Sequence, residues 1–419
     1  MSSQSVQIIG GPDREHAYVT PGNRLMVDMA LGDSPSIDAF DRLRVSNPVT
    51  VFDSILKYSK GDNLWYEDIT GGATSVHQFD EASVLMTVST SGDKAIRQSR
   101  EYFRYQPGKS QFILMTFNLQ AAGDTTNVRR RSGYFDAENG IFLEQTAAGI
   151  AIVRRSHVTG SPVDERVEQA DWNLDAFPAF DPTKTQILAI DLQWLGVGRV
   201  RVGFVIDGIL SYVHQFNHAN ILSSVYMTTG QLPARHEIEA TGVPTGAASL
   251  RHICTAIMSE GGIELFNGIP HSASSGAPVA SSGTAVPLLS IRPKAIYEGE
   301  VNRIQVIQRE LQVINTGNGV AECHIIYDGV LTGAAFASVE ADSTMEYDTA
   351  ATAITGGHHV LMFYVPSSNQ ASAVQAASVT GKLALTLDIL GLNPTNLTIA
   401  VTNHGTAVVA ASQTWQEYQ

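Results

Sequence analysis

The sequence predicts an all-β protein, with an extended N-terminal arm followed by two β-sandwiches. Three observations predict this fold class. Strand-length runs with apolar residues at alternate positions recur from about residue 49 onwards. Turn-forming pairs lie within two of these runs, at Asp207-Gly208 and Asp328-Gly329. No amphipathic helix longer than two turns stands out, so the apolar faces are expected to pack sheet against sheet.

Residues 1–48 are predicted to form the extended arm. The segment has no sustained hydrophobic period and carries turn signals at Gly10-Gly11-Pro12 and Pro21-Gly22. Such a chain cannot bury itself and needs a surface on which to lie. We expect that surface to belong to a neighbouring subunit.

Residues 49–265 are predicted to form the first sandwich, because strand patterns follow one another with short turns. The apolar run at 110–120 suits a buried strand, and 185–194 alternates as a strand with one wet face should. The segments 140–146 and 149–156 read as a hairpin. The clearest element is 199–216, where Asp207-Gly208 supplies the tight turn between two strands.

Residues 266–287 are predicted to form a linker, because they contain no formal charge and are nearly all small residues and proline. Residues 288–419 then read as a second, Ig-like sandwich of about seven short strands. Its expected strands include 358–366 and 381–391, and Asp328-Gly329 predicts a hairpin within it.

Composition narrows the functional classes. The chain has 419 residues, enough for two or three domains, and a formal net charge of -14. An acidic chain is a poor general binder of nucleic acid or of anionic membranes, so neither is expected as a partner. No signal peptide or membrane-span-length apolar run is visible, so we expect folding in a cytoplasm. Cys254 and Cys323 are expected to be buried free thiols.

No catalytic or metal-binding motif is well supported, and the sequence predicts no enzyme, no cofactor and no metal. Glu340-Ala-Asp342-Ser-Thr-Met-Glu346 resembles the motif of laminarinase-type glycosidases, but a solvated acidic loop is the preferred interpretation. His358-His359 would point to opposite strand faces, and His214 and His218 lack ligand partners at a suitable spacing. A calcium site is a weaker alternative, with four acidic residues in or near one loop: Asp171, Asp175, Asp181 and Asp191.

A basic segment interrupts this acidic chain. Seven cations lie between 97 and 131 against Glu101 and Asp124, which leaves a local net charge of +5. We interpret RQSREYFRYQPGKSQ (97–111) as a strand of the central sandwich that Pro107-Gly108 turns into the buried strand at 111–119. The arginines are expected to meet acidic groups on the same or a neighbouring subunit, and nucleic acid is the less favoured partner. The cationic candidates for subunit contact are Arg97, Arg100, Arg104, Lys109, Arg129, Arg130 and Arg131.

Aromatic residues in the loop ADWNLDAFPAFDPTK offer an alternative function. Trp172, Phe177 and Phe180 are candidates for stacking on a sugar, although packing under the loop is the safer interpretation.

Several segments resemble a group of structural proteins from tailed bacteriophages. They are SIDAFDRLRVSNPVTVFDS (36–54), RQSREYFRYQPGKSQ, NVRRRSGYFDAENGIFLEQT (127–146) and VAASQTWQEY (409–418). The first segment adds Phe40, Arg42 and Arg44 to the subunit-contact candidates. The central region is similar to concanavalin or laminin-G-type jelly-roll sandwiches, a likeness at the level of fold.

The resemblance implies a non-enzymatic virion component, made in the cytoplasm of the bacterial host. The expected partners are other phage structural proteins and further copies of this chain, in a symmetric oligomer such as a trimer. Head fibre or capsid decoration, collar, and tail or baseplate all remain open. The alternative is a carbohydrate-binding host-adhesion module that recognises a host glycan.

Overall fold

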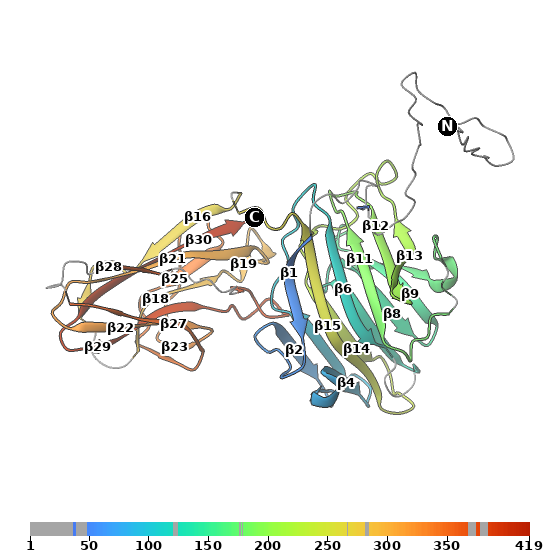
Figure 1. The fold of residues 1–419 in the computed structure, drawn as a ribbon, viewed down its shortest axis with the longest axis horizontal. Coiled ribbons are helices and arrows are strands. Elements are labelled where there is room, and N and C mark those ends of the chain that lie inside the picture. Colours follow the sequence, from blue (N-terminus) through green and yellow to red (C-terminus); the bar gives the residue numbers. More distant parts are fainter. Residues whose placement is uncertain are drawn as a thin grey trace, which may run out of the picture.

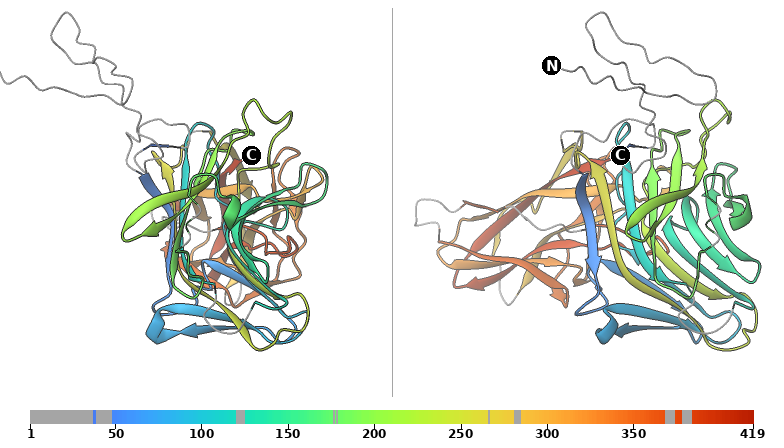
Figure 2. Two further views of the ribbon diagram at one scale, coloured as in Figure 1. Left: turned by 90° about the vertical axis from the view of Figure 1, so that its right-hand side faces the viewer. Right: turned by 45° about the vertical axis from the view of Figure 1, so that its right-hand side comes forward.

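The computed structural model describes residues 37–38, 48–119, 125–175, 177, 179–265, 267–280, 285–367, 374–377 and 384–419. These residues form two lobes that lie side by side, each made of two packed antiparallel sheets (Figures 1 and 2). The predicted all-β fold class is confirmed. The two helical segments in the described residues, η1 (Phe79–Glu81) and η2 (Gln169–Asp171), are single 3-10 turns. No helix in this part of the chain is long and apolar enough to cross a membrane.

The central lobe is a jelly-roll sandwich of an eight-stranded and a seven-stranded sheet. The first sheet contains β13 (Ile209–Phe216), β12 (Val200–Ile206), β11 (Gln186–Leu192), β6 (Gln111–Asn118), β15 (Ala248–Glu260), β4 (Ser83–Val88) and β3 (Thr74–Gln78), with β1 (Pro48–Ile55) paired to β15. The second contains β10 (Val163–Glu168), β9 (Gly149–Ser156), β8 (Gly140–Thr146), β7 (Val128–Phe135), β14 (Ala234–Ala240), β5 (Lys94–Ser99) and β2 (Trp65–Thr70).

Alternation along the strands builds one continuous core between these two sheets. Ile113, Met115 and Phe117 of β6 and Val200, Val202 and Phe204 of β12 all belong to it. The β12–β13 turn has positive φ at both Asp207 (49°) and Gly208 (80°), as a two-residue hairpin requires. The hairpin of β8 and β9 also forms, with Thr146 opposite Gly149. These predicted elements are confirmed.

The second lobe is a smaller sandwich of a five-stranded and a six-stranded sheet. The first contains β16 (Ile269–Ser274), β30 (Val408–Tyr418), β21 (Gln305–Asn315) and β28 (Val374–Ala377), with β17 (Val279–Ala280) paired to β30. The second contains β24 (Ala337–Ser338), β25 (Met345–Asp348), β18 (Val286–Pro293), β29 (Leu397–His404), β22 (Val320–Tyr327) and β27 (His358–Val365). Two small ribbons pair β19 (Ile296–Tyr297) with β20 (Glu300–Val301), and β23 (Val330–Thr332) with β26 (Ala353–Thr355).

Three predictions for this lobe are wrong in detail. The stretch predicted as a linker contributes β16, β17 and the start of β18. Small residues and proline can form the edge strands β16 and β17 because the longer strand β30 supplies the ladder, and the start of β18 pairs with β29. Asp328-Gly329 does not close a hairpin, since β23 pairs with β26 rather than with β22. The described part of 381–391 forms only an isolated bridge at Leu387. The Ig-like topology stays a prediction.

Both cysteines are free thiols, as predicted. Cys323 is buried in the core of the second sandwich, where burial raises the pKa of its thiol to about 12. Cys254 is only half-buried, on β15 of the central sandwich. The raised pKa leaves Cys323 with little of the thiolate that a reactive cysteine needs at neutral pH.

Candidate functional site

The outer face of the seven-stranded sheet carries a dense network of arginines and carboxylates. On β7, Val128 and Tyr134 point into the core, so the alternate residues Arg129 and Arg131 point to the other face. Glu144 of β8 and Glu237 of β14 belong to strands on either side of β7 and meet these arginines. The network therefore follows from strand alternation in three adjacent strands.

Arg131 is the centre of this ionic face. Its Nε lies 2.6 Å from Glu144 Oε2, its Nη1 lies 3.2 Å from Glu237 Oε1, and its Nη2 lies 3.7 Å from Asp164 Oδ2. Three carboxylates thus surround one guanidinium whose side chain is only 5% exposed. Around this centre Arg166 also pairs with Glu144, Arg129 with Glu239, Arg235 with Glu237, and Arg155 with Asp164.

The electrostatics keep these groups ionised at neutral pH. Burial alone would raise the pKa of Glu237, but Arg235, Lys94 and Arg131 outweigh it and lower that pKa to about 2. Burial lowers the pKa of Arg131 to about 10, against the opposing effect of Glu237. A carboxyl group that stays ionised at neutral pH cannot serve there as a general acid. Glu237 is therefore suited to holding arginines in place.

Aromatic rings form the floor beneath the charges. Phe135, Phe142, Ala151 and Val153 make a small buried cluster on this face, separate from the main core. The guanidinium carbons of Arg131 and Arg155 lie 5.3 and 5.2 Å from the centre of the Phe142 ring. Arg235 lies 5.3 Å from the centre of the Phe135 ring. The arginines thus cover apolar surface with their planar groups while their nitrogens pair with carboxylates.

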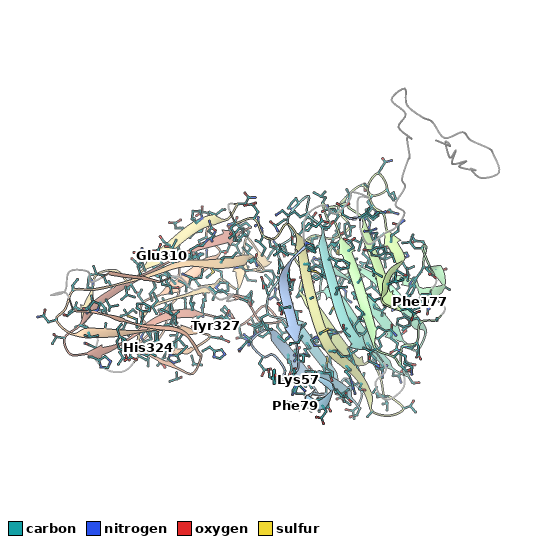
Figure 3. All side chains as sticks on the ribbon, viewed as in Figure 1. Lys57, Phe79, Phe177, Glu310, His324 and Tyr327 are labelled. Atoms are coloured by element: carbon teal, nitrogen blue, oxygen red, sulfur yellow. The ribbon has the colours of Figure 1, made fainter. Side chains whose placement is uncertain are left out.

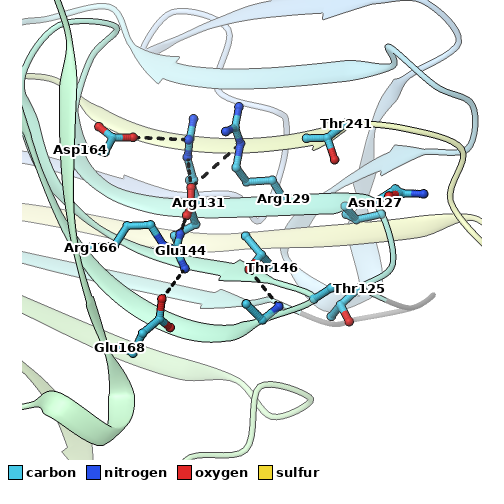
Figure 4. A pocket seen from close by; sticks show the side chains of 13 residues that line it. Thr125, Asn127, Arg129, Arg131, Glu144, Thr146, Asp164, Arg166, Glu168 and Thr241 are labelled. Atoms are coloured by element: carbon cyan, nitrogen blue, oxygen red, sulfur yellow. Dashed lines mark hydrogen bonds and ion pairs between the residues drawn. The ribbon is translucent and has the colours of Figure 1, made fainter.

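A pocket of about 460 Å³ opens at one end of this network (Figure 4). Three arginines and three carboxylates line it, together with hydroxyl and amide side chains and backbone of the neighbouring turns. The lining residues are Thr125, Asn127, Val128, Arg129, Arg131, Glu144, Thr146, Ala147, Ala148, Asp164, Arg166, Glu168 and Thr241. The formal charges balance, and no aromatic side chain lines the pocket. Its chemistry suits a polar, hydroxyl-rich ligand bound by hydrogen bonds.

The first part of the basic segment, residues 97–111, lies away from the ionic face, where the chain crosses between the two central sheets. Arg97 to Ser99 end β5 of the seven-stranded sheet, and Gln111 begins β6 of the other sheet. Between them the chain forms no ladder, apart from an isolated bridge between Phe103 and Leu232. The prediction of one continuous strand over the segment is therefore wrong. Pro107 and Gly108 do lie in the turn that leads into β6, and Gly108 has a φ of 88°.

This crossing segment contacts the second sandwich and the connection to it. Arg104 Nη1 donates to the Glu264 carbonyl at 2.8 Å, and its guanidinium lies 4.3 Å from the centre of the Tyr418 ring. Arg100 Nη1 lies 3.5 Å from Asp328 Oδ2. In return, Gln305 donates to Glu101, and the guanidinium of Arg303 lies 4.5 Å from the centre of the Tyr102 ring. We call this set of contacts the interdomain junction.

Burial corrects part of the subunit-contact prediction. Arg97 and Arg130 are fully buried and Arg131 is 4% exposed, so none of the three can meet a neighbouring subunit. Arg97 pairs with Glu67 and donates through Nε to His252 Nδ1, and Arg130 Nε donates to the Ser249 carbonyl. The physical reason is that carboxylates and carbonyls within the sandwich satisfy these charges, which a sequence count of net charge cannot show.

The other subunit-contact candidates have different outcomes. Arg100, Arg104 and Arg129 are partly buried, and Lys109 Nζ donates to the Gly262 carbonyl at 3.1 Å. Each has a partner within this chain, and their contact with another subunit stays a prediction. The last three candidates, Phe40, Arg42 and Arg44, lie outside the described residues. The nearest described part of the arm, Ile37-Asp38, is buried, and the Ile37 carbonyl accepts from Arg201 Nη2 at 2.6 Å.

The predicted glycan-stacking residues pack into the protein instead. Trp172 and Phe180 are 6% and 9% exposed and belong to the main core. Their ring centres lie 6.1 and 5.1 Å from that of Phe204. Phe177, labelled in Figure 3, is half-buried and packs against the same ring. Trp172 and Phe180 therefore have no free face for a sugar, because their rings pack into the core beneath the loop.

The calcium alternative also fails on geometry. Asp191 lies on β11 and pairs with Arg201 Nη2 at 2.6 Å, whereas Asp181 accepts hydrogen bonds from Thr183. Asp175 accepts from the Phe177 amide. Among the described residues, the acidic groups of this region do not form a three-ligand cluster.

The glycosidase-like carboxylates and the candidate histidines do not form a site together. Glu340 and Asp342 lie in an exposed loop between β24 and β25, as predicted, and Glu346 pairs with Arg292. His358 and His359 lie exposed at the start of β27, also as predicted. His214 and His218 are buried, and burial lowers the pKa of each to about 4. The laminarinase-type arrangement of carboxylates on one strand is not formed.

Sequence reasoning missed a buried histidine pair in the central core. The rings of His236 and His252 stack with centres 4.0 Å apart, next to Arg97. Burial, helped by Arg97, lowers the pKa of His236 to about 3, and burial with the neighbouring His236 and Arg97 lowers that of His252. A signal was present, because His236 alternates in phase with the core residues Ala234 and Ile238 on β14.

Comparison with known proteins gives a likeness to solved structures alone. No protein-family model matches the chain, and no curated protein matches it. The Emp47p carbohydrate recognition domain is 10% identical, with a TM-score of 0.35, and the match covers 51% of this chain and 97% of that one. An endo-1,3-beta-glucanase from Streptomyces sioyaensis is 8% identical, with a TM-score of 0.37 and coverages of 51% and 96%.

A third similar structure is the lectin I-B4 from Griffonia simplicifolia, in its metal-free form. It is 9% identical, with a TM-score of 0.31 and coverages of 50% and 99%. The similar structures thus include both carbohydrate-binding proteins and a glucanase, and the match covers about half of this chain. Identities and TM-scores this low carry no conclusion about what the chain does.

Proposed function

We propose that this protein is a non-enzymatic structural component of a tailed bacteriophage particle, where it assembles with other virion proteins and with copies of itself. Its position on the head, neck or tail is left open by the proposal. The segments that resemble phage structural proteins supply the starting point, and the structure gives those segments mechanical roles within the chain.

The interdomain junction is the observation that carries the proposal. The phage-like segment 97–111 joins the two sheets of the central sandwich, and its Arg100 and Arg104 reach Asp328 and the Glu264 carbonyl. The second phage-like segment, 127–146, contributes Arg131 and Glu144 to the ionic face. Both segments therefore serve to hold sheets and sandwiches in place, which suits a rigid building block better than a catalyst.

The experiment is to locate the chain in purified particles. Quantitative mass spectrometry of phage particles banded on a density gradient should find the chain in a fixed ratio to the major capsid protein. Particle-bound antibody seen by electron microscopy should fall at one position. A chain abundant in the infected-cell lysate but absent from the purified particles would overturn the proposal.

The arm offers a second, sharper test of assembly. A variant lacking residues 2–35 retains Ile37 and its contact to Arg201, so we expect it to fold as the full chain does. If the arm binds neighbouring subunits, this variant should be soluble and yet fail to join particles. Normal incorporation of the truncated chain would remove the arm from the assembly mechanism.

A carbohydrate-binding function is a second candidate, now on a different site. The pocket beside the ionic face has a polar, charge-balanced lining on one open sheet face, which is chemistry that can bind hydroxyl groups. A glycan array with the full chain tests it. A specific glycan signal lost in Asn127→Ala and retained in Trp172→Phe would support this site, and no signal on the array would remove the candidate.

A further inference from the structure

Three metal-ligating side chains meet at the rim of the second sandwich. His271 lies on the edge strand β16, and Glu340 and Asp342 lie in the loop between β24 and β25. One ligand atom from each residue lies within 4.8 Å of the other two. His271 Nδ1 is already 3.3 Å from Glu340 Oε2. Sequence spacing gives no hint of this group, because the histidine and the first carboxylate are 69 residues apart.

His271 is unusual among these residues because it is buried. The residue is 5% exposed, and its Nε2 has no hydrogen-bond partner. Its nearest charged neighbour on that side is the buried carboxylate of Glu417, with Oε2 at 3.9 Å. The imidazole therefore lies between two carboxylate groups, one buried on the Nε2 side and one exposed on the Nδ1 side. A polar ring buried with an unsatisfied nitrogen needs a reason.

Glu417 is held rigidly behind the histidine. Its carboxylate accepts from Ser343 Oγ and from the Thr344 amide, each at 2.6 Å, and from Trp415 Nε1 at 2.8 Å. A neutral imidazole with its proton on Nε2 would direct that proton toward Glu417 and leave the Nδ1 lone pair facing Glu340. Histidines that bind metals commonly have a carboxylate on the side of the second ring nitrogen. Here the 3.9 Å between Nε2 and Glu417 Oε2 is longer than a hydrogen bond, so Glu417 acts on the ring as a nearby charge.

The loop that carries the two exposed carboxylates is also fixed. Lys294 Nζ donates to the Ser343 carbonyl at 2.5 Å, and Asn302 Nδ2 donates to the Thr344 carbonyl at 2.9 Å. The Asp342 carbonyl accepts from Tyr297 and Gln419 side chains at 3.2 and 3.0 Å. The backbone at Asp342 is thus anchored from several elements, whereas the carboxylates of Glu340 and Asp342 stand at the exposed rim.

We propose that His271, Glu340 and Asp342 bind one Zn²⁺ ion, with the Glu417 carboxylate facing the far nitrogen of the histidine ring. One imidazole nitrogen and two carboxylate oxygens make a ligand set that Zn²⁺ accepts, whereas Ca²⁺ prefers six to eight oxygens. Tetrahedral zinc with bonds of about 2.1 Å holds its ligand atoms about 3.4 Å apart. The exposed carboxylates would need to close in only modestly, and a water molecule would take the fourth position.

Such an ion would tie the edge strand β16 to the loop before β25. These two elements belong to different sheets of the second sandwich. The ion would thus stabilise the sandwich where β16, the first strand after the central domain, is held mainly by its pairing with β30. Binding should raise the melting temperature of the second sandwich and slow hydrogen exchange in β16.

The test is to titrate the metal-free full chain with ZnCl₂ and to measure binding by isothermal titration calorimetry. We expect one site per chain that Mg²⁺ and Ca²⁺ do not occupy. Glu340→Gln with Asp342→Asn should weaken it by at least about tenfold, as loss of metal ligands does. The matched control is Glu298→Gln with Glu300→Gln, which removes the same charge from exposed positions of the same sandwich and should bind as the wild type does.

A spectroscopic readout checks that the histidine takes part. Co²⁺ in the site should give the visible absorption of a four-coordinate ion, and His271→Gln should abolish it. If His271→Gln fails to fold, the nitrogen-15 shift of the His271 ring in the wild type on Zn²⁺ addition takes its place.

Two results would overturn the proposal. One is a wild-type chain that binds no Zn²⁺ at the concentrations used for calorimetry. The other is binding unchanged in the Glu340→Gln, Asp342→Asn variant. In that case the surface group of Glu322, His324 and His404 would be the source, and His404→Gln would remove the signal. His324 is labelled in Figure 3.

Discussion

The two sandwiches share an antiparallel two-sheet plan but bury charged side chains very differently. The described part of the central sandwich buries six arginines, which are Arg97, Arg130, Arg131, Arg155, Arg201 and Arg235. In the described part of the second sandwich no arginine or lysine is buried, and its core is made of aliphatic residues around Trp415. Its arginines, such as Arg292 and Arg303, lie at the rim.

The difference teaches how each sandwich should respond to mutation. A buried ion network is stable only while every charge has its partner, because an unpaired buried charge keeps its desolvation penalty. An apolar core loses stability in proportion to the volume removed. The central sandwich should therefore be sensitive to single changes at its buried arginines, whereas the second sandwich should tolerate changes at the arginines and lysines of its rim.

The largest expected effect is at the centre of the ionic face. Arg131→Met removes a buried partner that Glu144 and Glu237 share and should lower the free energy of unfolding of the central sandwich by about 3–5 kcal/mol. Urea denaturation followed by tryptophan fluorescence measures it. Arg199→Met, at a partly buried position outside this network, is the control and should cost less than about 1 kcal/mol. Equal losses in the two variants would show that the buried ion network is no more sensitive to charge removal than a partly buried arginine outside it.

A cavity in the second sandwich should cost somewhat less. Ile325 of β22 is fully buried in its core, and Ile325→Ala should lower the free energy of unfolding by about 3 kcal/mol. Hydrogen exchange resolved by mass spectrometry should show the loss in β22 and β29, with the central sandwich unchanged. Met362→Ala on the adjacent strand, at a position that is 55% exposed, should change little. Spread of the effect into the central sandwich would mean that the two units unfold together.

The central sandwich should also be the more acid-sensitive one. His236 and His252 have folded-state pKa values below the ordinary 6.5, so their contribution is present above pH 6.5 and is lost as the pH falls toward the lowered values. Between pH 6.5 and 5.5 the pair should cost about 2 kcal/mol of unfolding free energy. Glu237 adds a further loss as the pH falls through its ordinary carboxyl pKa of 4.5 toward its lowered pKa of about 2.

Denaturant melts at a series of pH values check this expectation, with exchange rates read separately in each sandwich. The predicted slope should be seen in strands β14 and β15, which carry the two histidines. A central sandwich whose stability is flat between pH 6.5 and 5.5 would show that these histidines are protonated in the fold.

The smallest effect on stability is expected at the interdomain junction. Arg100 and Arg104 are partly exposed, so Arg100→Ala with Arg104→Ala should cost less than about 1 kcal/mol per residue. The consequence should appear in shape, because the two sandwiches lose contacts through Asp328 and Tyr418. Small-angle scattering should report a broader range of lobe separations than for the wild type or for Arg154→Ala. An unchanged scattering profile would show that contacts other than those of Arg100 and Arg104 hold the two sandwiches together.

Much of the fold could be predicted from the sequence, and the reasons for the failures are physical. Strands whose register is set by a buried face, such as β6 and β12, were predictable from alternation. Strand β16 was not, because its small residues carry no periodic signal and its pairing depends on β30, far away in sequence. The same limit applies to the site. Alternation along β7 predicts that Arg129 and Arg131 share one face. The carboxylates that complete the network could not be predicted, because they come from β8, β10 and β14, which pair with β7 or its neighbours only in the folded sheet.

The crossing segment has a mechanical consequence. Residues 100–110 connect the last residues of β5 to the first of β6, and so link the two layers of the central sandwich directly. The same segment contacts the second sandwich through Arg100 and the connection to it through Arg104. A pulling force on the second sandwich would therefore reach both layers of the central sandwich through this segment, in addition to the covalent connection that follows β15. The interdomain junction would thus transmit tension between the two sandwiches, although it contributes little to equilibrium stability.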